Sequence, residues 1–200
     1  MNKKTIIICI AAVAALAAGV FFTVKYRQNL FAKKAMNRIV ALADQGKLST
    51  TEYSFSQVIP LDDSADKWKI GERKALLSCR AYVEAGVDMT KYDAEKTHID
   101  KANKTISITL PPVEIINFNM DPNQMKVQYL KVTGMRTAIT QQERAEKYKE
   151  GEEEIRKMIP SSGIYEEAEK NAVRFFTDLL VNAGFDRSSI EITFEPRKRF

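Results

Sequence analysis

The sequence is poor in the residue types on which small disulfide-rich or metal-bound proteins depend. Its 200 residues include two cysteines and one histidine. Two cysteines cannot form a disulfide framework or a structural zinc cage. Eight glycines and six prolines exclude a collagen-like or low-complexity chain. The hydrophobic fraction of 44% is sufficient for a core, so wholesale disorder is excluded too.

The short motifs of common enzyme classes are also missing. No Gly-x-Ser-x-Gly elbow accompanies the only histidine, His98, and the chain has no glycine-rich phosphate loop. Residues 62–66 begin with the spacing of a calcium loop, but Lys67 and Arg73 occupy positions where such a loop needs Gly and Glu. We therefore expect no catalytic residue, no cofactor, no metal site and no enzymatic activity.

Three features that could serve catalysis or metal binding are more simply explained by a structural role. Cys79 falls on the apolar face of a predicted strand, which indicates a buried and inert thiol. His98 begins another predicted strand, where an exposed or edge histidine is the usual case. The acidic run 152–154 lies on a predicted helix and indicates a solvated face rather than a metal site.

Positive charge is concentrated at the N-terminus. The formal net charge is +5, yet residues after 47 are close to neutral. A domain that binds nucleic acid carries its positive charge on the folded part, so we expect no nucleic-acid partner. Residues 1–47 contain one acid, Asp44, against these bases: Lys3, Lys4, Lys25, Arg27, Lys33, Lys34, Arg38 and Lys47.

An uncharged apolar run extends from Ile6 to Val24. As a helix it would be roughly 28 Å long, close to the ~30 Å hydrocarbon core of a bilayer. It predicts a single-pass transmembrane helix or signal-anchor in the cytoplasmic (inner) membrane. The anchor residues are Ile6, Ile10, Leu16 and Phe22.

Two alternatives to an uncleaved anchor stay open. The pair Lys3 and Lys4 followed by Ala15-Leu16-Ala17 resembles a cleavable signal peptide, although the apolar run continues beyond that site. Cys9 suggests lipid attachment, but Ile8 stands where a small residue is expected.

The orientation of this anchor is predicted by two arguments that disagree. More bases lie after the apolar run than before it, which favours a cytoplasmic domain under the positive-inside rule. A short basic head before a long apolar run has the form of a signal sequence, which leads to export of the domain behind it. We favour export.

The chain divides into four predicted parts: residues 1–24, 25–47, 48–195 and 196–200. They are the signal-anchor, a basic juxtamembrane helix, a single α+β domain and a basic tail. The helix covers Tyr26–Gln45, where Phe31, Ala35, Ile39 and Leu42 recur at helical spacing and Gly46 ends the pattern. It serves either as an oligomerising stalk or, as we favour, as a helix that packs on its own domain or on lipid.

Alternating polarity predicts strands over 51–59, 73–84, 98–101, 105–110, 126–132 and 189–194. Pro60 is expected to close the first strand and Gly86 the second. Helices are predicted over 141–158, with pairs Glu143/Lys147 and Glu153/Lys157, and over about 163–183. The apolar stripe of the last helix comprises Ile164, Ala168, Ala172, Phe175, Leu179 and Ala183. Strands followed by helices favour an α+β fold with a mainly antiparallel sheet.

Several segments together resemble one bacterial family, domain of unknown function 4230. They are Thr50-Thr51-Glu52-Tyr53, the strand from Arg73-Lys74 to Ala85-Gly86-Val87-Asp88-Met89, and Thr105–Ile115 with its Leu-Pro-Pro, acid, Ile pattern. Gly163-Ile164, Ala168, Ala172 and Gly184-Phe185 resemble the family's C-terminal helix and the turn after it. The resemblance covers roughly residues 48–194. It implies one domain behind a hydrophobic segment and no established activity.

Three functions stay open for such a protein. We favour a membrane-tethered interaction or accessory module whose partner is a protein or envelope component. A small-ligand or lipid-binding module and an enzyme that uses only carboxylates are the alternatives. Asp88 and Glu114 are the weak candidates for a functional surface, although turn capping is the favoured explanation of both.

Overall fold

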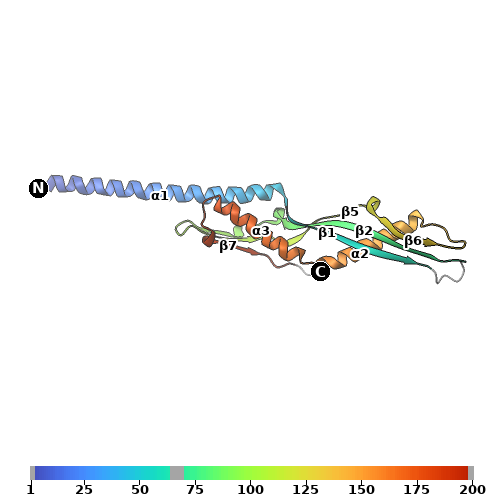
Figure 1. Cartoon of the computed structure of the whole chain (residues 1–200). Coiled ribbons are helices and arrows are strands. Elements are labelled where there is room, and N and C mark those ends of the chain that lie inside the picture. The colour runs from blue at the N-terminus through green and yellow to red at the C-terminus, as the bar shows by residue number, and fades with distance from the viewer. Residues whose placement is uncertain (1–2, 64–69, 198–200) are drawn as a thin grey trace. The chain divides into compact units, whose positions relative to one another are not determined.

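The computed structural model describes residues 3–63 and 70–197; in the N-terminal helix, the side chains of residues 3–15, 17, 24, 27, 28 and 31 lie outside this description. The fold class is α+β with mainly antiparallel sheets and C-terminal helices, as predicted (Figure 1). The chain divides into two compact units. Unit 1 comprises Met1–Gly46, Met89–Pro111 and Val173–Glu195, and unit 2 comprises Lys47–Asp88, Pro112–Ala172 and Pro196–Phe200.

Unit 1 contains the long helix α1, Lys3–Gln45. Its C-terminal part contributes Ala32, Ala35 and Ile39 to the core, so this end packs on its own unit. Gly46 ends the helix with a φ of 89°, a left-handed conformation that glycine adopts without strain. The Gly46 carbonyl accepts a hydrogen bond from Met89, the first residue of the short 3-10 helix η1, Met89–Lys91.

The sheet of unit 1 has the order β3-β4-β7. A short 3-10 helix, η2 (Ala94–Lys96), precedes the hairpin of β3, Thr97–Asp100, and β4, Thr105–Leu110. The buried face of β4 is Ile106, Ile108 and Leu110, as the alternation predicted. The 3-10 helix η5, Arg187–Ser189, leads into β7, Ile190–Phe194, which pairs with β4 in parallel.

Unit 2 is built on the long strand β2, Arg73–Asp88. On one edge β2 pairs with β1, Lys47–Asp62, and on the other with β5, Val113–Met120, and β6, Lys126–Val132. The 3-10 helix η3, Pro122–Gln124, joins β5 to β6. All these pairings are antiparallel.

Helix α2, Gln141–Met158, covers one face of the unit 2 sheet (Figure 1). Thr140 caps its N-terminus in a reciprocal pair with Glu143. The helix ends at Met158, as predicted, and Pro160 follows within the 3-10 helix η4, Ile159–Ser161. Helix α3, Ile164–Val181, follows, and Gly184 caps its end with a φ of 108°.

Two predicted strand ends are wrong. Pro60 does not close β1 but pairs with Leu76 inside it, because β1 is an edge strand where a missing N–H donor is tolerated. Gly86 does not close β2, which continues to Asp88. A Cβ at Gly86 would lie 1.9 Å from the Leu48 carbonyl oxygen, so glycine is needed there for the close approach of β1.

The predicted stripe of the last helix is wrong at two positions. Phe176 and Leu180 are buried, whereas Phe175 is 39% exposed and Leu179 is half-buried. The buried stripe keeps a spacing of four residues from Ile164 to Leu180, and the prediction departed from that spacing at Phe175. Strand β5 was not predicted at all.

The ion pairs predicted along α2 are replaced by other ion pairs. Lys147 binds Glu150 and Lys157 binds Glu154, each at a spacing of three residues. Glu143 instead binds Arg73 of β2.

In the described part of the chain, no helix is both long and apolar enough to cross a membrane. The side chains of Ile6 and Ile10 lie outside the described residues. Leu16 and Phe22 are described and are exposed, at 72% and 71%. The assignment of residues 48–195 to one domain stays a prediction.

Candidate functional site

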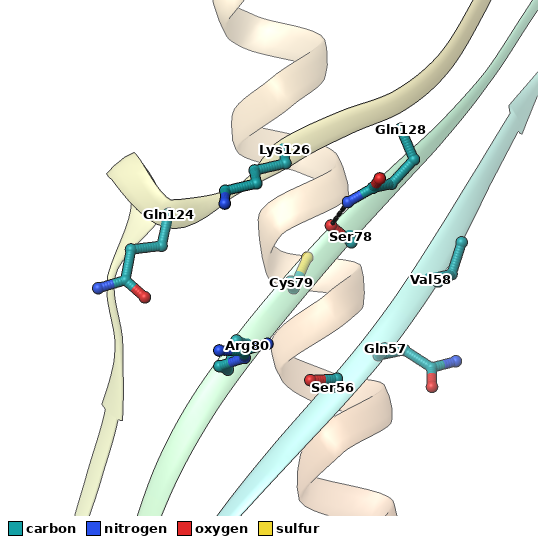
Figure 2. A pocket seen from close by; sticks show the side chains of 9 residues that line it. All are labelled: Ser56, Gln57, Val58, Ser78, Cys79, Arg80, Gln124, Lys126 and Gln128. Carbon is teal, nitrogen blue, oxygen red and sulfur yellow. Dashed lines mark hydrogen bonds between the residues drawn. The ribbon is translucent and has the colours of Figure 1, made fainter.

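A hollow of about 360 Å³ opens in the sheet of unit 2. Figure 2 shows side chains from three neighbouring strands, and from the segment before β6, around it. Helix α2 passes behind the strands. The lining residues are Ser56, Gln57 and Val58 of β1, Ser78, Cys79 and Arg80 of β2, and Gln124, Lys126 and Gln128.

The hollow lies where the pairing along one edge of β2 is interrupted. Strand β6 pairs with β2 up to Ser78, and β5 pairs with it from Ala81 onward. Cys79 and Arg80 therefore have no ladder partner on this edge, and residues 121–125 diverge from β2 at this point (Figure 2). Successive residues of an antiparallel strand direct their backbone groups to alternate edges. One of these two residues thus turns its N–H and C=O toward the interruption.

The chain around the interruption is fixed at both ends. Met120 and Met125 are buried. From α2, the Tyr148 hydroxyl donates to the Met120 carbonyl and Arg144 donates to the Met125 carbonyl at 3.1 Å. Asp121 caps η3 by accepting from the Asn123 amide at 2.9 Å. The gap is therefore a built part of the fold rather than a loose loop.

The lining of the hollow is positively charged. Among its nine residues, all of which are described, Arg80 and Lys126 are cations and none is acidic. Neither cation has a carboxylate partner among the described residues. The bulged residue Gln128 donates to the Ser78 hydroxyl at 2.8 Å, which leaves the Ser78 proton free to donate elsewhere. Such a lining can bind an anion.

The thiol of Cys79 borders the hollow but is not activated. Its residue is 3% exposed, and burial raises the pKa of the thiol, with the nearby Glu150 carboxylate as a second cause. A thiol that stays protonated at neutral pH is a poor nucleophile. The burial of Cys79 agrees with its predicted position on the apolar face of the strand.

A second polar cluster joins β2 to the start of α2. Arg73, buried on β2, donates to Glu143 at 2.5 Å and to Asp63 at 2.7 Å. Arg136 reaches the Asp63 backbone carbonyl at 2.8 Å. The Arg73 hydrogen bonds, and then that of the Thr140 amide, lower the pKa of Glu143 to about 2. The charges compensate one another, which is the arrangement of a structural clamp.

A model of the family described as "Protein of unknown function (DUF4230)" matches residues 41–190. The chain belongs to this family. No curated protein and no solved structure matches the chain significantly. The resemblance inferred from the sequence motifs is thereby confirmed, and the DUF4230 region includes every residue that lines the hollow.

The two predicted surface candidates of the DUF4230 region lie at one end of the unit 2 sheet. Asp88 is buried at the end of β2, opposite Lys47, and Glu114 is half-buried in β5, opposite Gly86. The lining of the hollow includes neither of them. Their role as a functional surface stays a prediction.

The remaining candidates of the DUF4230 region are placed as follows. His98 is exposed on β3. The acidic run on α2 carries surface pairs, Glu152 with Arg156 and Glu154 with Lys157. Within the described residues, no three His, Cys, Asp or Glu side chains are grouped so that they could hold a metal ion.

Sequence reasoning missed the hollow because it missed the interruption. Asp121-Pro122-Asn123 is a turn signal, with an N-cap residue before a proline, and it stands directly before a predicted strand. That signal, read together with an undetected strand before it, would have indicated a break within one edge of the sheet. The positions of Arg80 and Lys126 on the same edge follow only from the strand register.

Proposed function

We propose that this DUF4230 protein is a single-pass membrane protein whose folded part serves as an interaction or accessory module of the cell envelope. The tether is supported by the apolar side chains that α1 exposes. Leu16, Phe21 and Phe22 are each more than 60% exposed. Phe21 and Phe22 point about 100° apart on the helix, so no single face of its own protein could cover both. Lipid would cover them all.

The interaction role is supported by an apolar patch on unit 2. Leu76 of β2 lies opposite Tyr129 of β6 and Pro60 of β1, and Val58 lies two pairs further along, opposite Ser78. Cross-strand partners share a face of the sheet. Val58 and Tyr129 are each 49% exposed and Leu76 is 40% exposed. Three neighbouring strands thus present large apolar side chains together, as surfaces that bind proteins commonly do.

A photo-crosslinking experiment in native membranes tests this proposal. A benzophenone amino acid at Tyr129 is expected to give a discrete crosslinked species, and Leu76→Asp is expected to suppress it because a charge is placed at the centre of the patch. Glu52, exposed on the same face of β1, is the matched control position. No crosslink at Tyr129, or the same crosslink from Glu52, would contradict an interaction site at the patch.

The alternative, a small-ligand-binding module, is favoured by one specific observation, the hollow with two cations at the interruption of the sheet. Its lining combines apolar surface with polar side chains and two cations, Arg80 and Lys126. The two cations, with no acidic residue beside them in the lining, favour a ligand that carries an anionic group.

A further inference from the structure

We infer that the hollow in unit 2 is a binding site for a phosphate ester of a small polyol. The inference rests on the lining and frame of the hollow and not on the membrane tether. It assigns a ligand class to a site that includes neither of the predicted surface candidates.

The charge of the hollow selects an anion. Arg80 projects from β2, and Lys126 stands at the start of β6, beside Ser78 in the register. Figure 2 shows the two cationic side chains on different sides of the opening. An arginine offers a planar fork of N–H groups and a lysine a compact charge with three donors. Cations on separate sides suit the spread oxygens of a phosphate better than the two oxygens of a carboxylate.

The neutral lining suits hydroxyl groups. Ser56 and Ser78 supply hydroxyls, and Gln124 and Gln128 supply amides with both donor and acceptor atoms. The volume of about 360 Å³ is far larger than one ion needs and falls in the range of small-molecule sites. A glycerol-sized or sugar-sized group attached to the phosphate would occupy the remaining space.

The frame of the hollow reduces the cost of binding. The backbone on both sides of η3 is held by α2 through Arg144 and Tyr148, and the Gln128 amide is already oriented by Ser78. Groups held in place before binding lose less conformational entropy when the ligand arrives. The backbone frame and the Gln128 amide are thus in place before a ligand enters, whereas the exposed side chains of Arg80 and Lys126 become ordered on binding.

Titration calorimetry on the full chain in a neutral detergent tests the inference, with sn-glycerol 3-phosphate as the probe. We expect saturable binding at one site, and no binding of glycerol. Arg80→Gln and Lys126→Gln should each weaken binding about tenfold, the loss expected for one charge-assisted contact. Lys74→Gln is the matched control, since Lys74 is an exposed lysine on the same strand, outside the hollow. It should change the affinity less than twofold.

Two further arms separate the possible sources of the phosphate. Micelles doped with phosphatidylglycerol, compared with phosphatidylcholine, test a lipid headgroup, and competition by soluble glycerol 3-phosphate shows that both occupy one site. Binding of either phosphate that is weakened in both hollow variants supports the inference. It is overturned if the wild-type chain binds neither phosphate. It is also overturned if the hollow variants bind as well as the wild type, or if Lys74→Gln weakens binding equally. Equal thermal unfolding midpoints for the four proteins exclude misfolding as the cause.

Discussion

At the scale of single residues, the ion pair of Arg73 with Glu143 joins a buried cation of β2 to the start of α2. The Arg73 side chain is 8% exposed, and its guanidinium is bound by two carboxylates, those of Asp63 and Glu143. Glu143 also accepts from the Thr140 amide at 2.8 Å as part of the helix cap. One carboxylate therefore stabilises both the start of α2 and a buried cation.

This double role predicts an acid-sensitive contribution to stability. The pKa of Glu143 is 4.5 in the reference state and about 2 in the folded chain. Because the folded value is the lower one, the carboxylate stabilises the fold fully above pH 4.5, and this contribution is lost as the pH falls toward 2. The shift corresponds to about 3 kcal/mol. Urea unfolding between pH 7 and pH 2 should show this loss.

Glu143→Gln should lower the free energy of unfolding at pH 7 by about 3 kcal/mol, because the buried guanidinium loses a charged partner. The same variant should flatten the pH dependence between pH 4.5 and 2. Glu154→Gln is the control, since the surface pair of Glu154 and Lys157 contributes little. If Glu143→Gln leaves the pH dependence of stability unchanged, the loss of stability in acid does not come from Glu143.

At the scale of elements, α2 lies unusually close to β2 at Gly151. A Cβ added there would be 2.7 Å from the Cys79 sulfur. Elsewhere in a helix, Gly→Ala stabilises by about 1 kcal/mol. Here the added methyl group must displace a buried side chain, so the helix accepts a glycine in its middle for the sake of close packing.

The close approach predicts that the effect of Gly151→Ala on stability depends on whether the Cys79 thiol is present. In the wild-type chain, Gly151→Ala should destabilise by about 1–3 kcal/mol through overpacking. In a Cys79→Ala background, which itself costs about 1 kcal/mol, the same substitution should be neutral or stabilising. Denaturant unfolding of the four proteins gives the coupling energy. Additive effects would show that the thiol does not limit the approach of the helix.

The elements show how far the sequence determined the fold. The alternation in β2, from Leu77 to Ala85, placed the buried face correctly because successive residues of a strand point to opposite faces of the sheet. The hairpin of β3 and β4 was correct for the same reason. Pro60 was misjudged because its tolerance depends on whether its strand lies at an edge, which only the tertiary pairing decides.

Long-range pairing accounts for the other errors. The parallel pairing of β7 with β4 joins residues more than 80 positions apart, and no local pattern encodes it. The one-residue error at Phe175 arose because both neighbouring phenylalanines are apolar, so hydrophobicity could not choose between Phe175 and Phe176. The hollow was missed because it depends on the register of two strands against a third.

At the scale of the whole molecule, the proposed tether has a predicted orientation. The bases after the apolar run favour a cytoplasmic domain, and the short basic head before it favours export. We propose export, because the helix directly after the anchor can hold its bases against the headgroups of the outer leaflet. Among those bases, Lys33 and Lys34 are exposed.

A single exposed cysteine tests the orientation. Ala102 is exposed in the turn between β3 and β4, so Ala102→Cys in a Cys79→Ala background provides a reporter thiol. We expect a membrane-impermeant maleimide to label it in bacteria whose outer membrane alone has been made permeable. The Cys79→Ala chain without the reporter retains Cys9 in the apolar run and should stay unlabelled, because lipid shields that thiol. Labelling that begins only once the inner membrane is broken would place the domain in the cytoplasm, and the positive-inside argument would then prevail.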